Sequence, residues 1–278
     1  MKNTAISLYL DLMKKTLSFT LWPEPGIPLE TFNYKRSAAK RYFTHNLTKI
    51  LRRFKLQIVE IANYKEKDRE EGIIWPMYAE TMIGLKRLDN IQYCIEEVLR
   101  NKIEGDLIET GVWRGGACIF MKAVLSAYEE NERTVFVADS FEGLPKPDAT
   151  NFPADRGDSH HTEKFLAVSQ ENVEANFRRY NLLDSKVVFL KGWFKDTLPH
   201  APITKLSILR LDGDMYGSTM DALIHLYPKL SKGGFCIIDD YVLPGCKKAT
   251  DDYRAKENID APLLRIDNSG VYWQKGNN

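Results

Sequence analysis

The chain has no apolar run that approaches the roughly 18 residues needed to cross a bilayer, so its sequence predicts no membrane-spanning helix. Its N-terminus, MKNTAISLYLDLMKK, lacks the long apolar core and the small-residue cleavage site of a secretory signal. A large excess of one charge is also missing: the formal net charge is +1, which argues against a globally basic nucleic-acid binder. We therefore expect partners that include neither nucleic acid nor a membrane.

Cysteine is scarce, and its four copies show no CxxC spacing. At least Cys118 and Cys236 lie in apolar runs, which favours buried thiols over a disulfide framework or a zinc site. Thiols of this kind are typical of a reducing compartment, so we expect a cytoplasmic protein. The chain also has neither an internal repeat nor a low-complexity tract.

Beyond residue 102 the sequence alternates between strand-like apolar runs and helical patterns. We predict strands at 105–110, 134–139, 186–191, 206–211 and 235–239. We predict helices at 115–128, 163–180, 218–230 and 247–258. Residues 263–266 and 271–273 flank the turn Asn268-Ser269-Gly270 and predict a terminal hairpin. This order indicates an α/β fold with a doubly wound, mostly parallel sheet and an antiparallel edge.

Local signals place the ends of one helix and a long loop. Ser218, with Asp221 three residues later, predicts the N-cap of the helix at 218–230, and Gly233-Gly234 predicts its end. The loop 141–162 is long, polar and contains Pro, Asp and His, so we expect it to form a lid over the site.

Helical patterns also occupy the N-terminal part of the chain, at 5–20, 35–63 and 80–101. The second carries an apolar stripe of Leu47, Ile50, Leu51, Phe54, Ile58 and Ile61. Its other face is basic, with Lys35, Arg36, Lys40, Arg41, Lys49, Arg52, Arg53 and Lys55. That face is either simply solvated or a contact for phosphates or an anionic surface. We expect residues 1–75 to form a helical extension that offers a homo-oligomer interface, and residues 76–278 to form the main domain.

Acidic residues follow two of the predicted parallel strands. Asp212 and Asp214 follow the strand at 206–211, and Asp239 and Asp240 close the strand at 235–239. Crossover connections make these strands neighbours, so Asp212, Asp239 and Asp240 should come within reach of one ion. Oxygen-only ligands favour Mg²⁺, or else Ca²⁺ or Mn²⁺, over zinc. Asp214 is then either a fourth ligand or a free base.

A glycine-rich turn, ETGVWRGG at 109–116, joins the first strand to the next helix. It matches neither GxGxxG nor a Walker loop. Glycines here let a ligand approach the backbone near a helix N-terminus, although a tight turn without a ligand has the same pattern. Glu109 at the strand tip favours a cationic or amine-bearing ligand over a pyrophosphate.

Asp139 ends the second predicted strand, where an acidic residue typically accepts hydrogen bonds from ribose hydroxyls, although it could also cap an ordinary turn. Together with the glycine turn it indicates an adenosine-containing cofactor. NAD and S-adenosylmethionine both carry the ribose. We prefer S-adenosylmethionine, because it has an amino-acid moiety to pair with a carboxylate near the glycines and has no phosphate.

Three further residues have open interpretations. His160 and His161 are either solvated or close to the substrate. Trp193, which follows Gly192 at the end of the third strand, either stacks on adenine or packs against the protein.

Four motifs in order resemble the macrocin O-methyltransferase family, which methylates sugar hydroxyls of macrolides and related natural products. They are ETGVWRGGA at 109–117, ADSFEGLP at 138–145, LRLDGDMY at 209–216 and IIDDY at 237–241. The resemblance extends from about residue 75 to the C-terminus. It implies a Rossmann-like class I methyltransferase fold with a seven-stranded sheet, and it implies S-adenosylmethionine and Mg²⁺ as cofactors.

The resemblance also implies roles for individual residues. Asp212, Asp239 and Asp240 would hold the metal, and Asp214 would be the catalytic base. By the same resemblance Glu109, Gly111 and Asp139 would hold the cofactor. We expect further cofactor contacts from the neighbouring residues Thr110, Val112, Arg114, Gly115, Ser140, Phe141, Gly192, Trp193 and Asp212. We expect the substrate to contact Tyr216, Tyr241, His160 and His161, whose side chains suit a position near it.

The expected reaction is metal-assisted displacement of the sulfonium methyl by an acceptor hydroxyl, most simply a sugar hydroxyl of a glycosylated natural product or glycan. Two alternatives remain. One is an NAD-dependent oxidoreductase on the same fold. The other is a non-catalytic methyltransferase-like binding protein whose basic helix docks on RNA or a membrane.

Overall fold

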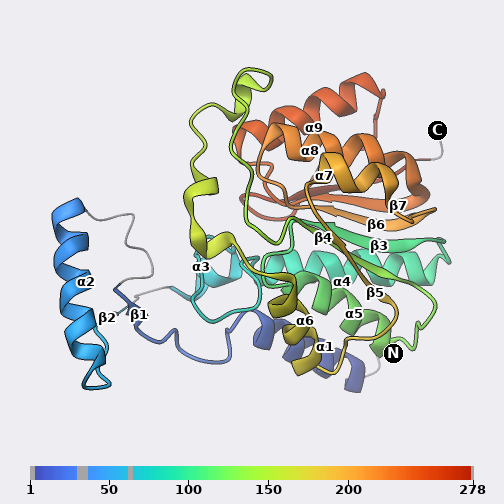
Figure 1. Cartoon of the computed structure of the whole chain (residues 1–278). Coiled ribbons are helices and arrows are strands. Elements are labelled where there is room, and N and C mark those ends of the chain that lie inside the picture. Colours follow the sequence, from blue (N-terminus) through green and yellow to red (C-terminus); the bar gives the residue numbers. More distant parts are fainter. Residues whose placement is uncertain (1–3, 30–36, 62–64, 277–278) are drawn as a thin grey trace.

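A seven-stranded sheet forms the centre of the computed structural model, which describes residues 4–29, 37–61 and 65–276 (Figure 1). The strand order is β5-β4-β3-β6-β7-β9-β8, with β9 antiparallel to β7 and to β8 and the other pairs parallel. The strands span Asp106–Thr110 (β3), Val135–Asp139 (β4), Val187–Lys191 (β5), Leu206–Leu211 (β6), Leu230–Ile238 (β7), Leu264–Arg265 (β8) and Val271–Gln274 (β9). The predicted mostly parallel sheet with a C-terminal antiparallel hairpin is confirmed.

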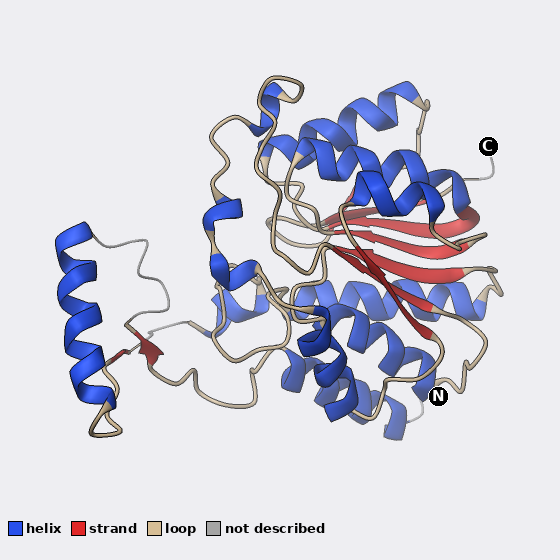
Figure 2. Cartoon of the chain, viewed as in Figure 1, coloured by secondary structure: helices blue, strands red, loops and turns tan. Residues whose placement is uncertain are grey.

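Helices cover both faces of the sheet (Figure 2). One layer contains α1 (Thr4–Leu17), α4 (Leu85–Arg100), α5 (Gly116–Ala127) and α6 (Gln170–Arg179). The other contains α7 (Phe194–Thr197), α8 (Tyr216–Leu226) and α9 (Pro244–Lys256). Side chains alternate along each strand, so Leu107 faces the first layer and Ile108 the second, and each layer closes its own apolar core. The carboxyl ends of the parallel strands meet at one edge of the sheet, which is where ligands bind in folds of this kind.

One part of the described N-terminal region packs against the helices that cover the sheet, and another part stands away from them. Helix α1 buries Leu10 and Leu17 against α5 and α4. Strand β1 (Ile27–Pro28) pairs with β2 (Val59–Glu60), and α2 (Ala38–Arg52) lies between them in the sequence. We call the described residues 27–29 and 37–61 the arm. Figure 1 shows α2 standing away from the body, whereas α3 (Glu66–Glu70) lies against it.

The predicted helix at 35–63 is shorter than expected. Residues 35, 36, 62 and 63 lie outside the described residues, and α2 ends at Arg52. Lys55 has a left-handed φ of +58°, and the Leu56 amide donates to the Leu51 carbonyl over 3.1 Å, which closes the helix. The chain beyond it pairs with β1, and the Leu29 amide donates to the Ile58 carbonyl over 3.2 Å. Tertiary pairing therefore overrides the helical periodicity of Ile58 and Ile61.

The predicted ends of α8 were also wrong. The helix begins at Tyr216, with Met215 as N-cap, and not at Ser218. It ends at Leu226, and a short 3₁₀ turn over Tyr227–Lys229 contains Pro228. Gly233-Gly234 lies inside β7, where the Gly233 amide donates to the Lys275 carbonyl over 2.8 Å.

The predicted lid, 141–162, contains no α-helix or strand and only short 3₁₀ turns at Pro153–Asp155 and His160–Thr162. Further 3₁₀ turns occupy Lys164–Leu166 and Leu198–His200. Helices α4 and α6 begin five and seven residues later than predicted, at Leu85 and at Gln170. Within the described ranges, no helix is long and apolar enough to cross a membrane.

Candidate active site

The glycine turn brings two strand ends into contact. Gly111 follows β3 with a φ of +85°, and a Cβ at this position would overlap the carbonyl oxygen of Asp212, which follows the neighbouring strand β6. The Asp212 amide in turn donates to the Thr110 carbonyl over 2.9 Å. Only glycine permits this approach, so Gly111 sets the spacing between the glycine turn and the acidic cluster.

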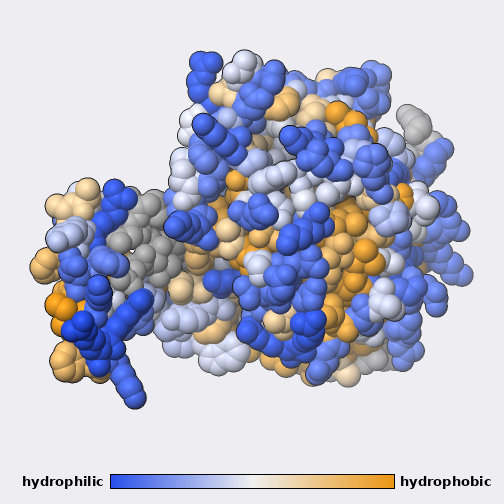
Figure 3. Space-filling model, in the orientation of Figure 1, coloured by the Kyte–Doolittle hydropathy of each residue, from blue (hydrophilic) through white to orange (hydrophobic). Residues whose placement is uncertain are grey.

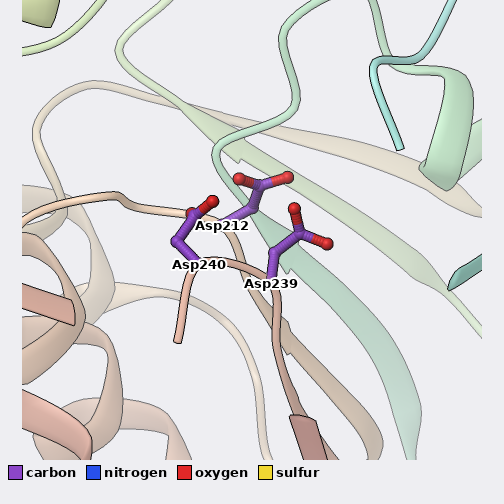
Figure 4. Close-up of side chains that lie close together, drawn as sticks. All are labelled: Asp212, Asp239 and Asp240. Atoms are coloured by element: carbon purple, nitrogen blue, oxygen red, sulfur yellow. The ribbon is translucent and has the colours of Figure 1, made fainter. Parts of the chain in front are cut away.

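The three predicted metal ligands lie together at the ends of β6 and β7. Asp212, Asp239 and Asp240 each offer a carboxylate oxygen, and these oxygens lie within 4.8 Å of one another (Figure 4). The parallel pairing of Leu211 with Ile238 places them there, as expected from the topology. An all-carboxylate donor set fits a hard divalent cation. Burial, followed by the charges of Asp214 and Asp212, raises the pKa of Asp240 well above its ordinary value, so a cation would relieve repulsion in this cluster.

Two arginines supply part of the counter-charge, and the sequence analysis missed both. Arg210, on β6, is fully buried and forms ion pairs with Glu109, Asp212 and Asp239. Arg87, on α4, pairs with the other oxygen of Asp239 and with Asp267. One signal was available, because an arginine in the apolar run LSILRL must find acidic partners when the strand is buried. These pairs hold Asp239 in place independently of any ion.

Asp214 lies beside the cluster on the turn into α8. It has a left-handed φ of +55°, and its amide donates to Asp240 Oδ2 over 3.3 Å. Burial, and next the charge of Asp212, raises the pKa of the Asp214 carboxyl to about 7, while the charge of His160 lowers it. A carboxylate of this basicity suits the role of a proton acceptor.

A cavity of about 370 Å³ opens at the same edge of the sheet. Its walls come from the segments after β3, β4, β5 and β6, from the lid, and from α8. The predicted residues that line it are Gly111, Asp139, Ser140, Gly192, Trp193, Asp212 and Asp214. Further lining residues, for which the sequence predicted no role in a site, include Met82, Lys146, Asp148, Phe194 and Lys195. The lid therefore forms part of the cavity wall.

Asp139 faces this cavity from the end of β4. Its Oδ2 accepts the Val112 amide over 2.7 Å, and its Oδ1 accepts the Phe141 amide over 2.7 Å. Burial raises the pKa of Asp139, and these backbone donors oppose that rise. Ser140 Oγ also donates to Oδ1, over 3.4 Å, and the Trp113 amide adds a further stabilising contact. A hydroxyl ligand would therefore share this carboxylate with protein donors or replace one of them.

Several predicted cofactor residues are not among those that line the cavity. The Glu109 carboxylate accepts Cys118 Sγ over 2.9 Å and pairs with Arg210, and burial raises the pKa of Glu109 to about 7. The Arg114 guanidinium donates to the carbonyls of Met77 and Ala79, over 2.9 and 2.8 Å. Thr110, Val112, Gly115 and Phe141 are likewise not among the residues that line the cavity.

Three of the four predicted substrate residues have side-chain partners in the protein, whereas His161 Nδ1 is buried without a hydrogen-bond partner among the described residues. Tyr216 Oη donates to Asp252 over 3.0 Å, and Tyr241 Oη donates to Asp251 over 2.6 Å, so both hydroxyls are held by α9. His160 Nδ1 lies 2.8 Å from Asp158 Oδ2, and His161 Nδ1 is buried. None of the four lines the cavity.

Comparison with known proteins now identifies the family. A model of the macrocin-O-methyltransferase (TylF) family matches residues 6–275. The chain belongs to this family. It is therefore an O-methyltransferase, as the four sequence motifs indicated, and the alternative of an NAD-dependent oxidoreductase is not supported.

Curated relatives match the chain over almost its whole length. The demethyldecarbamoylnovobiocin O-methyltransferase of Streptomyces niveus is 48% identical over 275 residues, which cover 98% of this chain and 95% of that relative. The mycinamicin III 3''-O-methyltransferase of Micromonospora griseorubida is 45% identical over 276 residues, or 98% of both chains. The Streptomyces olivaceus 8-demethyl-8-(2,3-dimethoxy-alpha-L-rhamnosyl)-tetracenomycin-C 4'-O-methyltransferase is 46% identical over 278 residues, which cover 99% and 95%.

Solved structures agree with this assignment. The structure of the O-methyltransferase NovP is 47% identical, with a TM-score of 0.83 over 98% of this chain and 99% of that chain. The calicheamicin methyltransferase CalS11 is 20% identical, with a TM-score of 0.57 over 87% and 95% of the chains, and this likeness shows the fold alone.

Proposed function

We propose that this O-methyltransferase transfers the methyl group of S-adenosylmethionine to a sugar hydroxyl of a glycosylated natural product, with Mg²⁺ as a second cofactor. One observation carries the proposal: the strand-end cavity contains Asp139 in one wall and Asp214 in another, and Asp214 adjoins a three-carboxylate cluster. The residue proposed to bind the ribose and the residue proposed as the base thus line the same cavity.

The cofactor is proposed to lie in the cavity against Gly111, Asp139, Ser140, Gly192 and Trp193. When bound, S-adenosylmethionine supplies an electrophilic methyl group. Asp139 would accept the ribose hydroxyls beside its backbone donors, most readily in place of the long Ser140 contact. Four predicted residues that do not line the cavity are proposed to support this wall: Thr110, Val112, Gly115 and Phe141. Glu109 is proposed to act on the wall indirectly, through its ion pair with Arg210. Arg114 orders residues 77–79 by its two backbone contacts.

The metal is proposed to bind Asp212, Asp239 and Asp240, whose oxygen donors fit Mg²⁺. When bound, it acts as a Lewis acid that lowers the pKa of an acceptor hydroxyl. Arg210 and Arg87 hold Asp239 at the position where it is needed. Asp214 is the proposed base, because it lines the cavity and because burial, with the charge of Asp212, raises the pKa of its carboxyl.

The acceptor is proposed from the relatives, whose names specify O-methylation of a mycinamicin at 3'' and of a rhamnosyl-tetracenomycin at 4'. Lid residues Lys146, Asp148 and Phe152 stand in the cavity wall and offer hydrogen bonds and one aromatic face to a sugar. Tyr216, Tyr241, His160 and His161 remain candidates for contacts with the aglycone outside the cavity.

Ligand binding tests this proposal directly. S-adenosylhomocysteine should raise the melting temperature of the wild-type protein, whereas NAD should leave it unchanged. Asp139→Ala should reduce the S-adenosylhomocysteine shift, because the ribose loses its acceptor. The exposed lid variant Glu142→Gln is the control and should retain the shift. A shift with NAD alone, or no methylated product from any glycosylated acceptor lacking one O-methyl group, would reject the function.

We also propose that the chain forms a homo-oligomer through its N-terminal helices, with residues 1–75 as an extension of a catalytic domain at 76–278. The arm exposes large apolar side chains, among them Phe43 at 68%, Ile50 at 55% and Phe54 at 71% (Figure 3). Helix α1 adds Leu8 and Leu12 on its outer face. Apolar groups exposed together are typical of an interface between chains.

Light scattering after size exclusion tests the interface. The double variant Ile50→Glu and Phe54→Glu should reduce the measured mass to that of one chain, because buried carboxylates would oppose association. Lys49→Glu, a charge reversal on the same helix, should leave the mass unchanged. A wild-type protein that is monomeric at every concentration tested contradicts this prediction. The four cysteines are buried free thiols, which supports our further proposal of a cytoplasmic location.

A further inference from the structure

The lid reaches into the first turn of α8 with a buried carboxylate. Asp155 is only 5% exposed. Its Oδ1 accepts the Tyr216 amide over 2.6 Å, and its Oδ2 lies 3.3 Å from the Gly217 amide. These amides are among the donors that an α-helix leaves unpaired at its N-terminus. Asp155 therefore supplies the capping hydrogen bonds at the N-terminus of α8 from outside the helix, although it lies 61 residues before Tyr216.

Two glycines make room for this contact. A Cβ on Gly245, at the start of α9, would overlap Asp155 Oδ1. A Cβ on Gly217 would come within 3.0 Å of the Phe152 ring, which stacks on Tyr216 with ring centres 5.4 Å apart. The lid is thus docked at two points, by a carboxylate and by an aromatic ring. Both Asp155 and Phe152 line the cavity.

The docked turn lies next to the proposed base. Only Met215 separates Asp214 from the capped amide of Tyr216, and Asp214 has a left-handed backbone. The turn is held on one side by the contact between the Asp214 amide and Asp240, and on the other by Asp155. Loss of the Asp155 contact would release the second anchor.

We propose that Asp155 is a positioning residue that couples docking of the lid to placement of the Asp214 carboxylate. This inference rests on the proposed function, because it takes Asp214 as the base. With the lid docked, Asp155 fixes the first turn of α8 and the lid closes one wall of the cavity. With the lid undocked, the turn loses its cap, and the base loses its alignment with an acceptor hydroxyl.

Hydrogen exchange on the full chain tests the coupling without substrate. Asp155→Ala should lower the protection of the Tyr216 and Gly217 amides roughly tenfold, the effect of a lost cap. It should lower the protection of the lid as well. Asp155→Asn should give a smaller loss, because its side-chain oxygen still accepts one amide. Glu142→Gln, a carboxylate-to-amide change on an exposed lid residue, should exchange like the wild type.

Kinetics provide the second measurement. Asp155→Ala should lower kcat by roughly 10- to 100-fold through misplacement of the base, while Mn²⁺ affinity stays at the wild-type value. Gly245→Ala, which displaces the carboxylate without removing it, should reproduce both effects if Asp155→Ala does not fold. Wild-type exchange at Tyr216 and Gly217 in both variants would overturn the proposal. Since exchange needs no turnover, that outcome is distinct from failure of the proposed function.

Discussion

Asp240→Asn is expected to abolish metal binding and methyl transfer while leaving the metal-free protein at least as stable as the wild type. Among the described residues, no basic side chain forms an ion pair with Asp240. Its carboxylate instead faces those of Asp212 and Asp214. Replacing it removes one ligand and also one source of repulsion. Asn retains an acceptor for the Asp214 amide, so the turn should persist.

Asp239→Asn is the matched comparison, since it also removes one carboxylate ligand. Asp239 is 3% exposed and pairs with both Arg87 and Arg210, so its loss leaves buried cationic groups with fewer partners. Breaking such a buried pair costs roughly 3 kcal/mol of unfolding free energy. Asp239→Asn should therefore lower the free energy of unfolding, whereas Asp240→Asn should leave it unchanged or raise it.

Mn²⁺ titration followed by electron paramagnetic resonance, together with chemical denaturation without metal, separates these effects. Both variants should show no saturable Mn²⁺ site, and only Asp239→Asn should unfold at lower denaturant. If the Asp240→Asn variant binds Mn²⁺ as tightly as the wild type does, Asp240 is not a ligand of the metal. If the wild type remains active in excess chelator, the metal takes no part in the reaction.

The sheet and the acidic cluster were predictable because both follow from local signals. Apolar runs identify the strands, and crossover topology makes Asp212 and Asp239 neighbours without further information. The family motifs contain the same residues. What the sequence did not indicate was the pairing of Asp239 with Arg210 and Arg87, because that pairing joins strands and helices that meet only in the folded chain.

The errors have a similar origin. Helix α8 begins before Ser218 because Asp155 caps it from the lid, and no local pattern predicts a cap from 61 residues away. Helix α2 ends at Arg52 because the following residues pair with β1. In each case a distant partner decided the structure.

Asp214→Asn should lower kcat by roughly 10²- to 10⁴-fold and leave Mn²⁺ affinity unchanged, because it removes a proton acceptor and no proposed ligand. Asn is the suitable replacement, since it adopts the left-handed backbone of this residue at least as readily as Asp does. The control is Asp196→Asn, an exposed carboxylate on α7 that should keep wild-type kcat. Single-turnover product formation by mass spectrometry and the Mn²⁺ titration give both values. A variant that loses Mn²⁺ would make Asp214 a ligand, and one with wild-type kcat would show that the acceptor proton leaves by another group.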